Sequence, residues 1–245
     1  MITKVIEEKT PYYVFDDIEN LRKVLLISEN ETRKMTSKET QHKNYGALLF
    51  RLVNFFKSQT VLQIGSSTGI MSLYLALPLR NSCMCYALEE RKGLLKHSLD
   101  FIRENHVQNL HFMEGDYDES LSQLKAKVDS FDLIFINQTG NPLKTIEAIE
   151  LVKPFIHKNS ILIIDGIARN KDMKDLWKKI NNHPKTRLTI DLLALGIIFF
   201  DEKLHKRHYK NYFDYGKKQN LYEKRRRRLN FIGRRKKGSK NQPAD

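Results

Sequence analysis

Two glycines separated by three residues stand between a short apolar segment and a helix-like segment, and such a turn can hold a nucleotide-like ligand. Residues 61–69 read Val-Leu-Gln-Ile-Gly-Ser-Ser-Thr-Gly, and residues 70–76 read Ile-Met-Ser-Leu-Tyr-Leu-Ala. Glycine suits a turn whose backbone needs a positive φ or must approach a ligand closely. The start of the helix adds free N–H groups and a partial positive charge. The Gly-x-Gly-x-x-Gly dinucleotide fingerprint is absent, because residue 67 is Ser.

Polar side chains or glycines also stand where four further strands are predicted to end. In an open sheet of parallel strands, ligands bind outside the carboxyl ends of the strands, so these residues are expected to line one cleft. In chain order they are Glu89 (or Glu90, if the strand is shifted by one), Gly115 and Asp116, Asn137, and Asp165.

Each acidic side chain in this set has a functional interpretation and a plainer one. Glu89 is placed to accept hydrogen bonds from both hydroxyls of a ribose, but it could also be a surface charge. Asp116, with the N–H groups beside it, could bind an adenine edge, or it could simply cap a helix. Asp165 is the candidate for a general base, and the alternative is a structural aspartate.

The hydrophobic pattern that positions these residues alternates between strands and helices. Such alternation predicts βαβ units, and therefore a parallel sheet with helices on both faces. The predicted strands are 61–64, 84–88, 110–113, 131–136 and 161–164, and the predicted helices of this part are 45–56, 70–76, 92–105, 119–127, 142–157 and 171–182.

Two further strands, 187–192 and 197–200, break the alternation. Only residues 193–196 join them, which permits an antiparallel hairpin but not a parallel crossover. We therefore expect an α/β fold in which five parallel strands are closed by a C-terminal antiparallel hairpin. This ending disfavours a nicotinamide-dependent oxidoreductase more strongly than the glycine spacing does.

Charge divides the chain into two parts. The 245 residues carry a formal net charge of +14, yet residues 203–245 alone hold 16 Lys and Arg against three acidic residues. Residues 1–202 are nearly neutral, with 27 basic and 26 acidic residues. We expect a helical and loop extension over 1–44, one folded domain over 45–209, and a basic, disordered tail over 210–245.

The basic segment has three interpretations. Arg225–Arg228 and Arg234–Lys237 bracket Leu229, Phe231 and Ile232, and four aromatic residues precede them between 209 and 215. Basic groups with interleaved aromatic rings can neutralise phosphates and stack on nucleic-acid bases. The same residues, taken over 203–240, could instead bind an anionic membrane surface or serve only to keep the protein soluble.

The sequence favours a cytoplasmic protein. No apolar run approaches the ~18 residues that a membrane span needs, and the first ten residues contain no apolar segment of the secretory type. The two cysteines, Cys83 and Cys85, are too close on one strand to bridge easily and too few for a structural zinc site. We expect both thiols to be buried and reduced.

Five segments, in this order and spacing, resemble the class I S-adenosylmethionine-dependent methyltransferases, and among these the small-molecule O-methyltransferases. They are residues 61–69, Tyr-Ala-Leu-Glu at 86–89, Glu-Gly-Asp at 114–116, Phe-Asp-Leu-Ile-Phe-Ile at 131–136 and Ile-Leu-Ile-Ile-Asp at 161–165. The resemblance spans about residues 45–209 and implies a Rossmann-like, seven-stranded sheet with S-adenosylmethionine as cofactor. The cofactor-binding residues it implies are Gln63, Gly65, Ser66, Ser67, Gly69, Glu89, Gly115, Asp116 and Asn137.

Three departures from the family pattern bear on the chemistry. The acidic residue usual two positions before the first glycine is Gln63 here, which can still form hydrogen bonds. Metal-dependent members carry an Asp after the fourth strand and an Asp-Asn pair after the fifth, where this chain has Asn137 and Asp165-Gly166. Their lysine, three residues after the first Asp, is Gly140 here. One carboxylate and one carboxamide make a poor oxygen cage for Mg²⁺ or Ca²⁺.

Two functions therefore follow as expectations. The first is a metal-independent methyltransferase that acts on an unidentified acceptor, with Asp165 as the catalytic base. The alternative is a catalytically inactive module of the same fold, which acts through its basic tail on nucleic acid or another polyanion.

Overall fold

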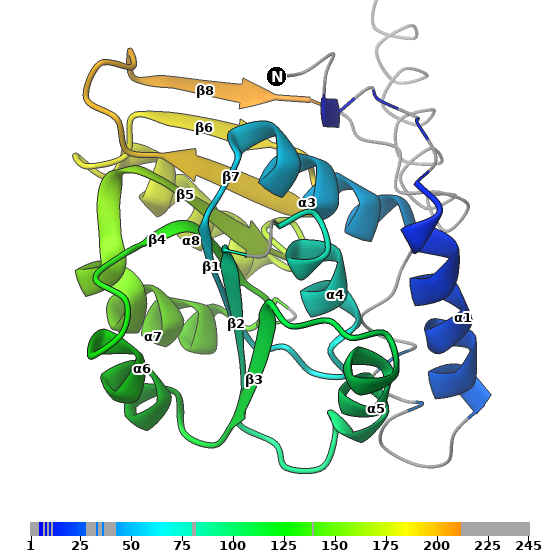
Figure 1. The fold of residues 1–245 in the computed structure, drawn as a ribbon. Helices are drawn as coiled ribbons and strands as arrows, with labels where there is room; N and C mark the ends of the chain where they lie inside the picture. Colours follow the sequence, from blue (N-terminus) through cyan, green and yellow to red (C-terminus); the bar gives the residue numbers. More distant parts are fainter. Residues whose placement is uncertain are drawn as a thin grey trace, which may run out of the picture. The chain divides into compact units, whose positions relative to one another are not determined.

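One β-sheet of eight strands organises the part of the chain that the computed structural model describes (Figure 1). The described residues are 12–27, 43–79, 82–138 and 140–211, together with Val5, Ile6, Glu8, Thr10, Arg33 and Thr36. The strands are β1 (Thr60–Ile64), β2 (Met84–Glu89), β3 (Leu110–Glu114), β4 (Phe131–Ile136), β5 (Ile156–Asp165), β6 (Leu188–Asp191), β7 (Leu195–Phe199) and β8 (Arg207–Lys210). Their spatial order is β3-β2-β1-β4-β5-β7-β6-β8.

The strand directions confirm the predicted arrangement. Strands β1 to β5 pair in parallel, whereas β7 runs antiparallel to both β5 and β6. The hairpin turn between β6 and β7 is tight, since the N–H of Leu192 donates to the carbonyl of Leu195 at 2.8 Å. Leu193 takes a positive φ of 72° within this turn.

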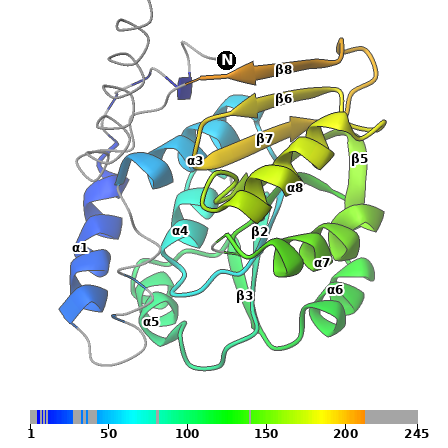
Figure 2. The ribbon, with the colours of Figure 1, turned by 180° about the vertical axis from the view of Figure 1, so that it is seen from behind.

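Helices cover both faces of the sheet, as Figures 1 and 2 show from opposite sides. The helices are α1 (Val14–Ile27), α3 (Lys43–Phe56), α4 (Ile70–Ala76), α5 (Lys96–Glu104), α6 (Tyr117–Lys125), α7 (Pro142–Val152), the 3₁₀ turn η2 (Lys153–Phe155) and α8 (Lys171–Asn182). One face carries α6, α7 and α8, and the other carries α3 and α4, with α1 packed outside them.

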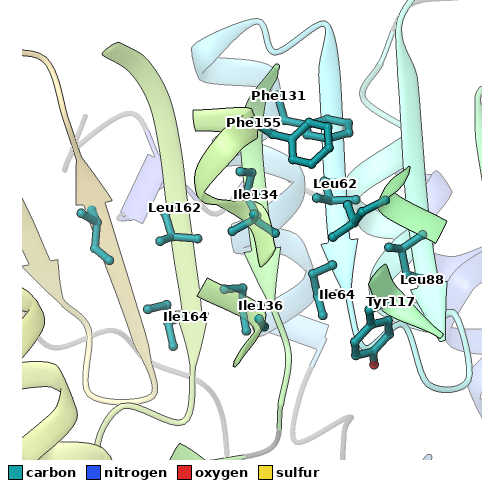
Figure 3. Packing of buried hydrophobic residues seen from close by; sticks show 14 of the residues in the cluster. Leu62, Ile64, Leu88, Tyr117, Phe131, Ile134, Ile136, Phe155, Leu162 and Ile164 are labelled. Carbon is teal, nitrogen blue, oxygen red and sulfur yellow. The ribbon is translucent and has the colours of Figure 1, made fainter. Parts of the chain in front are cut away.

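The alternation of side chains along the strands explains the two layers. In Figure 3, even-numbered residues of β1, β4 and β5 form a continuous row that includes Ile64, Ile136 and Ile164. This row packs against α6, α7 and α8, where Trp177 fills the space over Gly196. On the opposite face, Phe15 of α1 contacts the rings of Phe50 and Tyr74 at centroid distances of 5.0 and 5.3 Å.

The strand β8 is an eighth strand that the hydrophobic pattern did not predict. It pairs in parallel with β6, from Leu188 opposite Arg207 to Asp191 opposite Lys210. All four of its residues are exposed, so it lacks the apolar alternation of a half-buried strand. Backbone hydrogen bonds hold it instead, among them Asn211 N–H to the Asp191 carbonyl at 2.8 Å.

Several predicted boundaries were wrong: the strand predicted from residue 161 begins at Ile156, and the helix predicted over 119–127 is Tyr117–Lys125. The helix predicted over 142–157 ends at Val152, and Ile156 already belongs to β5. Pro154 explains the early end, because it lacks the N–H that would continue the helix. The helix predicted from residue 92 begins at Lys96.

The contacts within the chain divide it into the units Met1–Phe213 and Asp214–Asp245. The second unit and most of the predicted basic tail lie outside the described residues, as does most of the segment 28–42. Both cysteines are free and buried. Within the described part of the chain, no helix is long and apolar enough to cross a membrane.

Candidate functional site

The residues predicted to line a cleft follow neighbouring strands that end in register. Ile64 of β1 pairs with Leu88 of β2 on one side and with Ile136 of β4 on the other. Ile136 in turn pairs with Ile164 of β5. The glycine turn, Glu89, Asn137 and Asp165 therefore start from one edge of the sheet, as predicted for strand ends in an open α/β fold.

The turn after β1 is shaped by alternate residues with positive φ. The φ values are 79° at Gly65, 52° at Ser67 and 82° at Gly69. The carbonyl of Leu88 accepts hydrogen bonds from the N–H groups of both Gly65 and Ser66, at 3.0 and 2.9 Å. A Cβ on Gly65 would lie 2.4 Å from the carbonyl oxygen of Asn137, so glycine is required here for space as well as for φ.

Glu89 closes this turn from the neighbouring strand. Its carboxylate accepts a hydrogen bond from the backbone N–H of Ser67. The other oxygen, Oε1, accepts from Nε of Arg91 at 2.7 Å and from the Arg91 backbone N–H at 3.1 Å. Glu89 is only 1% exposed, and its buried charge is compensated by these three donors.

The side chains of Ser66 and Ser67 lie buried in the same turn with unused hydrogen-bonding capacity. They are 1% and 2% exposed, and neither hydroxyl has a partner among the described residues. Buried polar atoms are rarely left unpaired, because the loss of hydration is then uncompensated. The two hydroxyls are therefore suited to a polar ligand that enters the turn.

Gln63 lies behind the turn rather than along it. The side chain is fully buried, and its Oε1 accepts from Oγ of Ser72 in α4 at 2.8 Å. Its Nε2 donates to the carbonyl of Gly65 at 3.3 Å. Gln63 thus ties the first glycine to the following helix and positions the turn.

Gly115 and Asp116 follow β3, next to the end of β2. The N–H of Gly115 donates to the carbonyl of Glu89 at 2.9 Å. Oδ1 of Asp116 accepts from the N–H groups of Asp118 and Glu119, at 2.9 and 3.1 Å, and so caps α6. The plainer interpretation of Asp116 is therefore realised in the structure, and its second carboxylate oxygen has no partner within the described part of the chain.

Two residues beside the turn were missed by the sequence analysis. Gln138 donates from Nε2 to the hydroxyl of Tyr117 at 3.4 Å, and both side chains are buried. The same Nε2 would lie 3.5 Å from a Cβ on Gly65. Burial, and then the charge of Glu89, raise the pKa of Tyr117, which keeps its hydroxyl protonated. Gln138 directly follows Asn137, so a search one residue further along the strand end would have found it.

Asp165 belongs to a separate polar group at the end of β5. Its Oδ1 accepts a hydrogen bond of 2.7 Å from the hydroxyl of Tyr45 in α3. Burial raises the pKa of the Asp165 carboxyl above its ordinary value, whereas the Tyr45 hydroxyl, the charge of Arg169 and the Gly166 N–H oppose that rise. This aspartate is held in a defined orientation and needs less acid to take up a proton than an exposed one.

Arg169 and Gly140 meet on the same side. A Cβ on Gly140, whose φ is 77°, would come within 2.4 Å of Cδ of Arg169. The Arg169 stem thus crosses the place where a side chain at residue 140 would begin. In the described residues, no three His, Cys, Asp or Glu side chains are grouped so that they could hold a metal ion.

Comparison with known proteins identifies the fold. Residues 62–167 match the family model described as a methyltransferase domain. Similar solved structures include an O-methyltransferase from Bacillus cereus in complex with SAH, at 16% identity and a TM-score of 0.58, covering 81% of this chain and 94% of that chain. A methyltransferase from Geobacter sulfurreducens is 14% identical with a TM-score of 0.62, and the match covers 81% of this chain and 95% of that chain. An SAH-bound methyltransferase from Podospora anserina is 18% identical with a TM-score of 0.59, and the match covers 76% of this chain and 88% of that chain. No curated protein matches the chain significantly.

Proposed function

We propose that this chain, which carries a class I, O-methyltransferase-like methyltransferase domain, transfers a methyl group from S-adenosylmethionine to an acceptor without a metal ion. The observation that carries the proposal is the closed turn after β1, in which the Ser67 N–H binds Glu89 while the buried hydroxyls of Ser66 and Ser67 have no partner in the part of the chain that the structure describes. A polar ligand in the turn would satisfy both hydroxyls. A module that binds no cofactor gains nothing from leaving them unpaired.

The residues around the turn have separate roles in holding the cofactor. Gly65 and Gly69 let the backbone approach the methionine and sugar portions, and Gln63 supports the turn from behind. Glu89 accepts from the ribose hydroxyls after sharing or exchanging its present donors. Gly115, Asp116 and Asn137 lie at the neighbouring strand ends, and the Asp116 oxygen that has no partner among the described residues is proposed to bind the adenine edge.

S-adenosylmethionine supplies an electrophilic methyl group when it is bound, so the protein has to align the acceptor. A base is needed where the acceptor carries a proton that must leave. Asp165 is proposed as the proton acceptor, with Tyr45 fixing its orientation. The raised pKa of Asp165 makes its carboxylate a better base than an exposed aspartate. The charge of Arg169 acts on the Asp165 carboxyl and opposes the rise of its pKa, so Arg169 is proposed to tune this base.

Metal independence is proposed from the donor groups. The positions that would supply two aspartates hold Asn137 and Asp165, and Asp165 is engaged with Tyr45. Hard divalent cations favour several carboxylate oxygens, which this pair does not provide. Activity should therefore survive treatment with EDTA, and added Mg²⁺ or Ca²⁺ should not increase it.

Calorimetry on the full chain tests the cofactor. S-adenosylmethionine, S-adenosylhomocysteine and NADH are titrated separately into the wild type, Glu89→Gln and Glu90→Gln. Glu90 is the matched control, because it is the next residue but pairs with Lys144 at 2.8 Å on the surface. Binding of the first two ligands that is weakened only by Glu89→Gln supports the proposal, whereas binding of NADH alone contradicts it.

A second measurement separates the enzyme from the inactive module. Methyl transfer from labelled S-adenosylmethionine is screened against hydroxyl-bearing small molecules and RNA, with wild type and Asp165→Asn. Transfer that disappears in Asp165→Asn, while calorimetric cofactor binding is retained, supports the catalytic assignment. Cofactor binding with no transfer to any acceptor would favour the module that acts through its basic tail.

A further inference from the structure

The strand β8 gives the domain a basic, exposed sheet edge. It is the last strand in the order of the sheet and lies outside β6 in Figures 1 and 2. Residues 203–211 contain Lys203, Lys206, Arg207 and Lys210, with two histidines and no acidic residue. The four β8 side chains are all exposed, so this positive charge is on the surface.

The two faces of β8 differ in whether their side chains contact side chains of the neighbouring strand β6. His208 and Lys210 turn to one face, where Nδ1 of His208 lies 2.8 Å from the Thr189 hydroxyl and Lys210 lies 4.0 Å from Asp191. Arg207 and Tyr209 turn to the other face. Within the described residues neither of these two side chains has a hydrogen-bond or ion-pair partner, and Tyr209 is 43% exposed. An exposed guanidinium thus lies two residues from an exposed ring.

The direction of β8 places this surface at the candidate site's edge of the sheet. β8 is parallel to β6, and both β6 and β5 are antiparallel to β7, so β8 runs in the sense of β5. The chain therefore leaves β8 at the carboxyl edge, where Asp165 ends β5. Beyond that point the sequence continues with Tyr212, Phe213 and Tyr215 and with twelve more Lys and Arg residues, all outside the described part.

We propose that β8, with the basic residues 203–206 that lead into it, is a binding surface for single-stranded nucleic acid. Arg207 and the basic residues neutralise phosphates, and Tyr209 offers a face on which a base can stack. A partner of this kind matches both the charge and the aromatic ring. The surface requires neither the cofactor nor methyl transfer, so the inference is independent of the proposed function.

The composition of β8 favours nucleic acid over a membrane. A segment that lies in a bilayer interface buries an apolar face beneath its basic groups. β8 consists of Arg, His, Tyr and Lys and presents no aliphatic side chain. A bare polycation would bind either surface, but the exposed ring of Tyr209, two residues from Arg207, adds a face on which a base can stack.

Fluorescence anisotropy with the full chain tests the proposal. The protein is titrated into labelled oligouridylate or oligothymidylate of about 20 nucleotides at about 50 to 200 mM salt, without cofactor. The test variant is Arg207→Gln with Tyr209→Ser. The matched control, Lys125→Gln with Lys127→Gln, removes two exposed positive charges at the end of α6, away from β8.

We expect the wild type to bind both oligonucleotides, with affinity that falls steeply as salt rises. The β8 variant should bind about five-fold more weakly or worse, and its salt slope should fall by about 0.7 for the lost phosphate contact. The control should change less than two-fold. Tyr209→Ser alone, which keeps every charge, should weaken binding without altering the salt slope.

Three results would overturn the inference. The first is no oligonucleotide binding by the wild type at 50 mM salt. The second is equal binding by the β8 variant and the control, since β8 would then contribute nothing beyond net charge. The third is preference for vesicles containing phosphatidylserine over both oligonucleotides in a sedimentation assay. Thermal melting of each variant excludes loss of folding as the cause of a change.

Discussion

The backbone N–H of Ser67 and the carboxylate of Glu89 are joined by a hydrogen bond, although the residues are 22 positions apart in the sequence. The bond connects the glycine turn after β1 to the end of β2. A ligand that displaces either residue therefore also displaces the other, and the turn cannot open without breaking the hydrogen bond to the buried carboxylate.

Removal of the Ser67 hydroxyl should separate stability from ligand binding. Ser67→Ala keeps the backbone donor to Glu89 and deletes a buried hydroxyl that has no protein partner among the described residues. We expect the free energy of unfolding to stay within about 0.5 kcal/mol of wild type, because no hydrogen bond is lost. Affinity for S-adenosylhomocysteine should fall about five-fold or more. Urea unfolding and calorimetry check the two halves, and unchanged affinity would remove Ser67 from the binding site.

Gly65→Ala should destabilise the protein more than Gly93→Ala. Both glycines have a positive φ near 80°, so both substitutions carry the backbone cost of about 1 kcal/mol. Only at residue 65 does the new Cβ also meet the Asn137 carbonyl, because the space around Gly93 is open. We expect an additional loss of about 1–3 kcal/mol at residue 65. Equal urea midpoints for the two variants would contradict this reading of the turn.

Gln63 and Ser72 should be energetically coupled. Gln63→Leu leaves the buried Ser72 hydroxyl without its partner, and that loss should cost about 1–3 kcal/mol. In Gln63→Leu with Ser72→Ala, the unpaired hydroxyl is gone, so the double variant should recover part of the loss. A double-mutant cycle of unfolding free energies measures this coupling. Strict additivity of the two single changes would show that the hydrogen bond contributes no stability.

The fall of the methyl-transfer rate at low pH should follow protonation of the Asp165 carboxyl. Because its pKa is raised, the carboxylate needed as a base should be lost on acidification at a pH above the ordinary aspartate value. Tyr45→Phe removes a hydrogen bond that lowers this pKa, so it should move the acid limb to still higher pH. The pH profile of kcat for wild type and Tyr45→Phe is the measurement. If the acid limb of the kcat profile is at the same pH in both proteins, Asp165 is not the group whose protonation stops methyl transfer.

The same carboxyl should affect stability with a defined sign. The folded state binds the Asp165 proton more tightly than the unfolded chain does, so this group's contribution to stability is present below the unfolded pKa and is lost as pH rises through the folded pKa. Asn at residue 165 does not titrate. The unfolding free energy of Asp165→Asn minus that of wild type should therefore increase with pH across this window. Urea unfolding from pH 4 to 8 measures the difference, and a pH-independent difference would contradict the prediction.

The features that could be predicted from the sequence are those written in short segments. The strands of residues 61–64 and 131–136 are apolar runs long enough only for buried strands, and the short link after residue 192 requires a hairpin. Gly65 and Gly69 mark positions where the backbone must turn with positive φ. These properties depend on each residue and its near neighbours, so spacing and residue type were sufficient.

The sequence by itself therefore determined the class of the fold, the edge of the sheet that carries the polar residues, and the charge difference between the body and the basic segment. Only the tertiary structure decided that Gln63 supports the turn through Ser72 of α4 and that Tyr45 holds Asp165 from 120 positions away. It also added β8, a strand held by backbone pairing with no apolar pattern. The physical reason is that a side chain's partner depends on which distant segments the packed core brings alongside it, and local periodicity carries no record of that pairing.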